Sequence, residues 1–297
     1  MSVLEVTQVA DGQQYTDHRH PAWTPYFYFD QFFTTGLKAA QALASIGIAC
    51  VDKRINNSAE VDPNRKDILH YLLIARDPST GGDLPNVEIK AEALTQLIAG
   101  SDTTGNTITH LIDMLIRNPD KCRKLQEELD RTYPSPLPSD FVAMFVDCKD
   151  LPYTEAVIYE TLRLRTTVSL GLPRVVPAGG AWVCGQFFKE GTVLSTPTYT
   201  VHRDERVWGP DALEFRPERW IGAPNRAEME NNFLGFSYGP RACIGRNVAF
   251  MELKKTVATL FRRFQYRHIN PHQDSHIREG FHLKCQTLPV FIARREK

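Results

Sequence analysis

Apolar residues recur at intervals of three and four along several stretches of this 297-residue chain, which is the spacing of amphipathic helices. The pattern predicts helices over residues 37–55, 64–76, 88–118, 120–132, 153–165 and 244–263. The helix over 88–118 would be the longest, at about 46 Å for a rise of 1.5 Å per residue. Alternation over 175–193 predicts two short strands, and an apolar run over 288–293 predicts another. The expected fold class is therefore mainly α with small β-sheets.

The composition is that of an ordinary globular chain, with 42% hydrophobic and 24% charged residues and a formal net charge of zero. This balance of charge gives no reason to expect nucleic acid as a partner. The cysteines lack the paired spacing of a zinc site or a disulfide framework, so we expect scattered and mostly buried thiols at positions 50, 122, 148, 184, 243 and 285. No run of 18 or more apolar residues occurs, and the sequence therefore predicts no transmembrane segment.

One ten-residue segment, Phe236-Ser-Tyr-Gly-Pro-Arg-Ala-Cys-Ile-Gly245, places a single cysteine just before a predicted helix. The Gly-Pro pair within it cannot continue a helix or a central strand, so Cys243 is expected to end a tight loop. Arg241, Arg246 and the N–H groups of a helix start all favour the thiolate, which predicts a lowered pKa for Cys243. A thiolate presented in this way suits an axial ligand of iron. A buried structural cysteine is the alternative for the cysteine taken alone.

The whole pattern Phe-x-x-Gly-x-Arg-x-Cys-x-Gly resembles the haem-binding loop of the cytochrome P450 family. Every defining position is filled, by Phe236, Gly239, Arg241, Cys243 and Gly245. The resemblance implies a haem b cofactor with Cys243 as the axial ligand of its iron. Further motifs follow in the family's order from about residue 64 to the C-terminus, and the style of the loop is similar to that of eukaryotic, specifically fungal, haem-thiolate monooxygenases.

The segment Ala99-Gly-Ser-Asp-Thr-Thr-Gly105 places poor helix formers inside the longest predicted helix, each at a cost of some tenths to about 1 kcal/mol relative to alanine. The residues alone leave open a kink tolerated at a packing contact or a widened helix that faces a flat cofactor. Asp102 and Thr103 resemble the family's acid–alcohol pair, and the resemblance implies that they relay protons to dioxygen. Their presence favours oxygen activation over the family's isomerases or peroxide-using enzymes.

Glu160 and Arg163 are three residues apart and so share one face of the helix predicted over 153–165. An isolated surface pair of this kind is common and contributes roughly tenths of a kcal/mol. The pair resembles the family's Glu-x-x-Arg signature, whose usual third member is an arginine in a Pro-Glu-Arg segment, here Arg219. The resemblance implies that these three residues form a structural charge network rather than a catalytic one.

The resemblance also implies which residues meet the cofactor and the substrate. Arg174 and Arg241 would each bind a haem propionate through parallel N–H groups. His202 would be a satisfied structural histidine rather than a metal ligand. The residues that would touch a hydrophobic substrate are themselves mostly apolar: Leu97, Ile98, Leu170 and Phe281.

The activity that the resemblance implies is the insertion of one oxygen atom of dioxygen into an apolar organic substrate, with electrons from an NADPH-cytochrome P450 reductase. Basic residues after Cys243 would face the acidic surface of that reductase: Arg246, Lys254, Lys255, Arg262 and Arg263. Two other interpretations stay open. One is a non-catalytic remnant with impaired haem binding, and the other is a haem-thiolate isomerase or peroxide-using enzyme.

Members of the family are substantially longer than this chain. The resemblance therefore implies a P450 fold truncated at its N-terminus, a single partial domain over 1–297 in which residues 1–60 are poorly readable and residues 61–297 carry the motifs. Apolar surface left uncovered is expected, with the aromatic-rich run over 23–33 as a candidate. Relatives of this type are bound to the endoplasmic-reticulum membrane, and a chain without their anchor would be cytoplasmic or membrane-peripheral.

Overall fold

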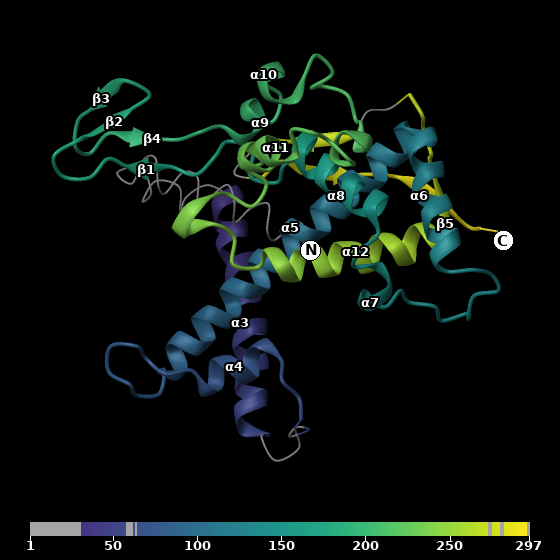
Figure 1. The fold of residues 1–297 in the computed structure, drawn as a ribbon. Coiled ribbons are helices and arrows are strands. Elements are labelled where there is room, and N and C mark those ends of the chain that lie inside the picture. The colour runs from purple at the N-terminus through teal and green to yellow at the C-terminus, as the bar shows by residue number, and fades with distance from the viewer. Residues whose placement is uncertain (1–30, 58–61, 63, 273–274, 280–281, 296–297) are drawn as a thin grey trace. The chain divides into compact units, whose positions relative to one another are not determined.

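The computed structural model describes residues 31–57, 62, 64–272, 275–279 and 282–295. The chain divides into two compact units, Met1–Thr103 and Thr104–Lys297, and the longest helix, α5 (Asn86–Arg117), has residues in both (Figure 1). Phe281 lies outside the described residues, as does most of the aromatic-rich run over 23–33. Within the described part of the chain, no helix is both long and apolar enough to cross a membrane.

The first unit contains α3 (Gln31–Asn56), α4 (Ile68–Ile74) and the start of α5. Asp67 joins α3 to α4, because its carboxylate accepts the His70 N–H at 2.9 Å and also pairs with Arg54. The guanidinium of Arg54 holds the pKa of Asp67 well below its usual range. The helix predicted over 64–76 is shorter than expected, because Asp67 caps its first turn.

The second unit holds the C-terminal part of α5 and the remaining helices. These are α6 (Pro119–Thr132), α7 (Phe145–Cys148), α8 (Pro152–Leu164), α9 (Thr198–Val201), α10 (Glu205–Trp208), α11 (Arg226–Asn232), α12 (Arg246–Arg263) and the 3-10 turns η3 (Pro217–Trp220) and η4 (Gly239–Arg241). Helices α5, α6, α8 and α12 begin and end within two residues of their predicted limits, whereas α3 begins at Gln31 and not at residue 37. The four residues of α7 were not predicted, because one turn is too short to show a helical period.

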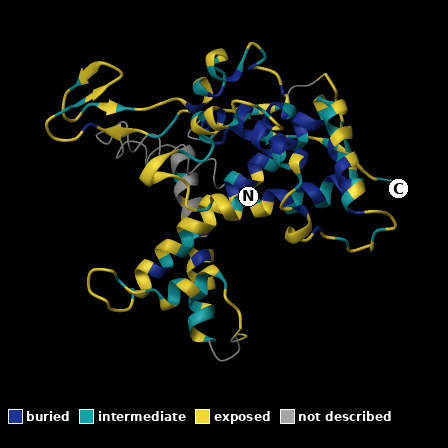
Figure 2. Cartoon of the chain, in the orientation of Figure 1, coloured by how far each residue is buried: buried dark blue, intermediate teal, exposed yellow. Residues whose placement is uncertain are grey.

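Helix α8 forms the centre of the core of this unit. Every residue from Tyr153 to Leu164 except Glu155 is buried, and α8 packs against α6, α12 and η3 (Figure 2). Fully buried leucine, isoleucine and phenylalanine side chains join the three helices: Leu125 and Leu129 of α6, Ile158 of α8, and Leu253 and Phe261 of α12. Each such side chain contributes about 1.5–3 kcal/mol relative to an exposed one.

The N-terminus of α8 is capped by a carboxylate from α6. Glu128 accepts the Tyr153 N–H, the Thr154 N–H and the Thr154 hydroxyl, each at 2.8 Å. These N–H groups have no partner inside the helix, and a negative charge also complements the positive end of the helix dipole. Glu128 is itself 7% exposed, so the cap is a buried interaction.

The described strands pair into four two-stranded antiparallel sheets. Their pairs are β1 (Arg174–Val175) with β4 (Val193–Leu194), β2 (Ala181–Val183) with β3 (Gln186–Phe188), β5 (Phe264–His268) with β8 (Val290–Arg294), and β6 (His276–Arg278) with β7 (Lys284–Thr287). The prediction of two strands over 175–193 is wrong, because the segment holds four (Figure 1). The missed turn is Cys184–Gly185, where both φ angles are positive at 47° and 78°, as a tight two-residue hairpin requires.

Buried polar side chains of α5 hold strand β7 (Lys284–Thr287) and the residue before it. The Asn106 amide donates to the Leu283 carbonyl at 2.6 Å and accepts the Cys285 N–H at 3.0 Å. His110 Nε2 lies 3.2 Å from the same carbonyl, so the neutral ring donates to it. Burial lowers the pKa of His110 to about 4.

We expect the free energy of unfolding to fall as the pH drops below neutrality. An exposed histidine has a pKa of about 6.5, whereas burial lowers the pKa of His110 in the folded chain to about 4. Between these values the unfolded state binds more protons, so the stabilisation is complete above about pH 6.5 and declines toward pH 4, by about 1.4 kcal/mol per pH unit for one group. Urea midpoints at about pH 7 and about pH 5 should show this fall. His110→Gln should reduce it, and an unchanged pH dependence in that variant would contradict the assignment.

Candidate functional site

The segment from Phe236 to Gly245 forms a tight loop that leads into α12. The Cys243 N–H donates to the Phe236 carbonyl at 2.8 Å and closes the loop. Gly239 opens η4 with a φ of +74°, while a Cβ there would meet nothing within 4 Å, so backbone conformation rather than space favours glycine. Gly245 is the N-terminal cap of α12. Cys243 therefore ends the loop two residues before this cap.

The surface beside Cys243 is open and apolar. The Cys243 side chain is exposed and Ile244 is fully so, while Val248 and Met251, at helical spacing along α12, are 40% and 37% exposed. A Cβ at Gly245 would lie 3.9 Å from Cys243 Sγ, which is an ordinary van der Waals contact, so space around the sulfur does not itself require glycine. A thiol next to an exposed apolar stripe, with an arginine two residues away, is a donor set that fits a haem and its propionates.

Two exposed arginines are the predicted partners of the propionates. Arg241 ends η4. Arg174 opens β1 opposite Leu194, and its Nη1 donates to the Pro173 carbonyl at 2.9 Å. Both side chains reach solvent, and a propionate role for them stays a prediction.

Asp102 and Thr103 lie in the first unit, on α5, whereas Cys243 lies in the second. The helix continues without interruption through residues 99–105. Thr103 Oγ1 donates to the Ala99 carbonyl at 2.8 Å, which satisfies the hydroxyl within the helix. Asp102 is 8% exposed, so its carboxyl is held at a buried position. Their proton relay also stays a prediction.

Glu160, Arg163 and Arg219 meet in a buried network. Arg163 binds Glu160 through two N–H groups, at 2.8 and 2.9 Å, and Arg219 Nε donates to Glu160 at 2.9 Å. Both side chains of the Glu160–Arg163 pair are 0% exposed. The Glu160 carboxylate also accepts hydrogen bonds from two donors that the motif did not indicate, Trp220 Nε1 at 2.8 Å and the Arg216 N–H at 2.9 Å. The pair is therefore a core element and not a surface ion pair.

The same arginines fasten the irregular segment between α9 and η3 to α8. Arg163 Nη1 donates to the His202 and Ala212 carbonyls, both at 2.6 Å. Arg219 donates to the carbonyls of Trp208 and Asp211 at 2.8 and 2.9 Å. Each guanidinium thus satisfies backbone carbonyls as well as Glu160, which is how a buried ion pair avoids a large desolvation cost.

His202 is fully buried and bonded through both ring nitrogens. Nδ1 lies 3.0 Å from the Arg163 carbonyl, and Nε2 accepts the Leu234 N–H at 2.8 Å. These partners require the neutral form with the proton on Nδ1, and burial lowers the pKa of His202 to about 3. The contacts are those of a structural histidine, and they hold the segment that leads into the Cys243 loop.

The basic residues of α12 do not form the exposed set that a docking surface would need. Lys254 is 7% exposed and donates to Glu155 at 2.6 Å, and Arg262 is 2% exposed and donates to the Tyr133 carbonyl at 2.7 Å. Arg263 donates to the Ser139 carbonyl at 2.8 Å. The interpretation of these side chains as contacts for a reductase is therefore wrong for Lys254 and Arg262.

The expectation of mostly buried thiols is also wrong. All six cysteines are free, but only Cys148 and Cys285 are buried, while Cys50, Cys184 and Cys243 are exposed. Burial of a small side chain depends on contacts between distant segments, which spacing does not report. Within the part of the chain that the structure describes, no group of three acidic, histidine or cysteine side chains could hold a metal ion.

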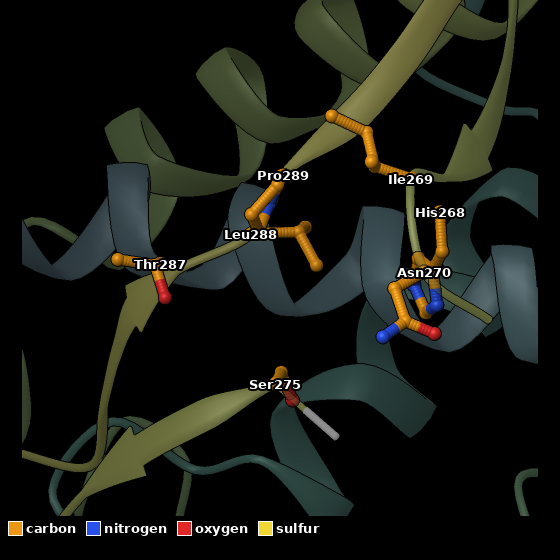
Figure 3. A pocket seen from close by; sticks show the side chains of 7 residues that line it. All are labelled: His268, Ile269, Asn270, Ser275, Thr287, Leu288 and Pro289. Carbon is orange, nitrogen blue, oxygen red and sulfur yellow. The ribbon is translucent and has the colours of Figure 1, made fainter. Parts of the chain in front are cut away.

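The apolar residues predicted near the substrate are partly exposed. Leu97 and Ile98 of α5 are 40% and 38% exposed, and Leu170 is 43% exposed. A small cavity of about 150 Å³ lies elsewhere, at the ends of the C-terminal strands, lined by His268, Ile269, Asn270, Ser275, Thr287, Leu288 and Pro289 (Figure 3). Of the predicted site residues that the structure describes, none lines this cavity.

Comparison with known proteins decides the family. The model of the cytochrome P450 family matches residues 7–291. The chain belongs to the cytochrome P450 family. A crystal structure of a cytochrome P450 superposes with a TM-score of 0.78 and 28% identity, over 92% of this chain and 60% of that one. The predicted P450 fold, mainly helical with small sheets, is thereby confirmed.

Two relatives of this P450 chain are fungal proteins. It is 41% identical over 281 residues to a benzoate 4-monooxygenase of Aspergillus niger, a match that covers 93% of this chain and 53% of the relative. It is 35% identical to a cytochrome P450 monooxygenase of Aspergillus terreus, over 76% of this chain and 46% of that protein. The P450 chain thus spans about half the length of these curated relatives.

Sequence reasoning missed several residues that shape the P450 site. Trp220 follows the predicted Arg219 directly, so its position next to the Pro-Glu-Arg segment was a usable signal. No local sequence signal indicated Tyr159 or Glu128. Tyr159 binds Arg246, which lies 87 positions away along the chain, and Glu128 caps α8 by binding Tyr153, which lies 25 positions away. Such partners become visible only when the helices pack.

Proposed function

We propose that this chain is part of a haem-thiolate monooxygenase that inserts one oxygen atom of dioxygen into an apolar organic substrate. The Cys243 loop carries the proposal, because it presents an exposed thiol just before α12 beside an apolar stripe. When bound, a thiolate-ligated haem supplies the chemistry that cleaves the O–O bond. The chain's own residues bind the group, position it and move protons.

The proposed binding roles follow from residue chemistry. Cys243 would ligate the iron, while Phe236, Gly239 and Gly245 shape the loop that carries it. Arg174 and Arg241 would bind the haem propionates, because a guanidinium group donates two parallel hydrogen bonds to a carboxylate.

Proton delivery is the proposed role of Asp102 and Thr103. Thr103 Oγ1 donates a hydrogen bond to the Ala99 carbonyl. A hydroxyl can both donate and accept hydrogen bonds, which is the chemistry that a proton relay uses. The buried carboxyl of Asp102, the next residue along α5, can hold the proton that the relay passes on.

The proposed substrate is hydrophobic, because Leu97, Ile98 and Leu170 offer exposed apolar surface. Benzoate is the first compound to test, since a relative that shares 41% identity is a benzoate 4-monooxygenase. The proposed electron source is an NADPH-dependent reductase. Because two basic residues of α12 are buried, that partner would have to use other cations than Lys254 and Arg262.

The carbon-monoxide difference spectrum of the dithionite-reduced, haem-loaded chain tests the proposal. We expect the red-shifted Soret band of a thiolate-ligated haem, its complete loss in Cys243→Ala, and its retention in Cys50→Ala, which removes another exposed thiol. A flat trace, or the shorter-wavelength band alone, would contradict the proposal and favour a non-catalytic remnant. Where the band is present, product formed from peroxide but not from reductase and NADPH would contradict the electron source.

A further inference from the structure

Arg246 contacts both ends of the Cys243 loop. Its N–H lies 3.4 Å from the Cys243 carbonyl, and its guanidinium carbon lies 5.6 Å from the centre of the Phe236 ring. Phe236 is the residue whose carbonyl accepts the Cys243 N–H and so closes the loop. The same guanidinium lies 5.8 Å from the Phe250 ring, and its Nη2 donates to the Tyr159 hydroxyl at 3.2 Å.

Tyr159, the residue that accepts the hydrogen bond from Arg246, is held in place because it lies on the buried helix α8. It is 7% exposed and stacks on Trp220 at 4.9 Å between ring centres. It also packs against Phe233 and Phe250, each at 5.1 Å. Trp220 in turn donates to Glu160 at 2.8 Å. A continuous set of contacts therefore runs from the Glu160 network through Tyr159 to Arg246.

We infer that Tyr159 is a positioning residue: its hydroxyl fixes Arg246, and Arg246 fixes the loop that presents the Cys243 thiol. A hydrogen bond from a guanidinium is charge-assisted, and the faces of Phe236 and Phe250 attract the cation to the same place. Arg246 is exposed to solvent, so the rings and the hydroxyl are what restrict it. The inference rests on the proposed function, and it deepens it by naming what holds the proposed iron ligand in place.

Amide hydrogen exchange on the full chain without haem tests the contact directly. Tyr159→Phe keeps the ring and removes only the hydroxyl. We expect the Cys243 amide to exchange about tenfold faster, the factor that corresponds to one charge-assisted hydrogen bond. Arg246→Gln should give a similar increase, Arg246→Lys a smaller one, and the double variant of Tyr159→Phe with Arg246→Gln should add little to either change.

Tyr153→Phe is the matched control. Tyr153 also lies on α8, and its hydroxyl bonds to Glu218 Oε1 at 3.0 Å, away from the loop contacts. This control should leave exchange at Cys243 unchanged. Equal exchange in Tyr159→Phe and the wild type, or additive effects of Tyr159→Phe and Arg246→Gln, would overturn the inference. If Tyr159→Phe fails to fold, the exposed Arg246→Gln tests the same contact alone.

A spectroscopic readout then separates positioning from general stability. In the haem-loaded, reduced carbon-monoxide complex, Tyr159→Phe should convert from the thiolate-type band to the shorter-wavelength band about tenfold faster than wild type and Tyr153→Phe. Equal conversion rates would overturn the inference. A wild-type chain without any thiolate-type band would count against the proposed function only, because the exchange measurement requires no haem.

Discussion

Glu160→Ala should destabilise the second unit by about 3–5 kcal/mol, the cost of leaving a buried charge without its partner. Arg163 and Arg219 are 0% and 2% exposed, and both lose the carboxylate that neutralises them. Trp220 Nε1 and the Arg216 N–H lose their acceptor as well. Since whole domains are stable by about 5–15 kcal/mol, this single change should remove a large part of the free energy of unfolding.

Chemical denaturation followed by circular dichroism measures the effect. The midpoint should shift strongly toward low denaturant, with Arg206→Ala as the control for loss of one charge. The Arg206 side chain is 88% exposed and pairs with Asp204, so its removal should cost less than about 1 kcal/mol. A Glu160→Ala variant as stable as Arg206→Ala would show that the network is dispensable.

Glu128→Ala should cost about 3 kcal/mol through the N-terminus of α8. The substitution removes the acceptor of three buried donors, namely the Tyr153 N–H, the Thr154 N–H and the Thr154 hydroxyl. Each buried donor without an acceptor costs about 1–3 kcal/mol. Water that enters the vacated space would offset part of this sum. The loss of a helix cap alone costs about 1 kcal/mol, so the larger value reflects burial.

The neighbouring Glu127→Ala is the natural comparison, because this side chain is 54% exposed and its nearest cation lies 4.0 Å away. Its unfolding free energy should differ from wild type by less than about 0.5 kcal/mol. Thermal unfolding of both variants at the same pH checks the contrast. Equal melting temperatures for the two would rule out a buried cap at Glu128.

Much of the fold could be predicted because helix periodicity is a local property. The limits of α5, α6, α8 and α12 follow, within two residues, from apolar spacing together with Pro119 at a helix start. The errors arose where one residue acts across segments. Asp67 lies inside the range predicted for α4 and, as its N-terminal cap, makes the helix begin later than predicted. The turn at Cys184–Gly185 adds a hairpin within the range where only two strands were predicted.

The candidate site could be predicted in part, because the P450 motifs are short and specific. Motif spacing selected Glu160, Arg163 and Arg219, and the structure brings these three side chains together. Trp220 and Tyr159 were missed because aromatic side chains are common in cores, and only packing shows which of them touches a carboxylate or a guanidinium. Composition predicted that most cysteines are buried, but Cys243 is exposed, since burial also depends on packing between distant segments.

The positions of the donors to Glu160 along the chain affect when the core can fold during synthesis. Arg163 is three residues away, but Arg219 and Trp220 follow Glu160 by 59 and 60 positions. While a ribosome has released α8 but not yet η3, the carboxylate lacks these two donors, and burying it would be costly. Helix α8 should therefore stay open to solvent, and to chaperones, until residue 220 has emerged, so the centre of this core folds late in synthesis.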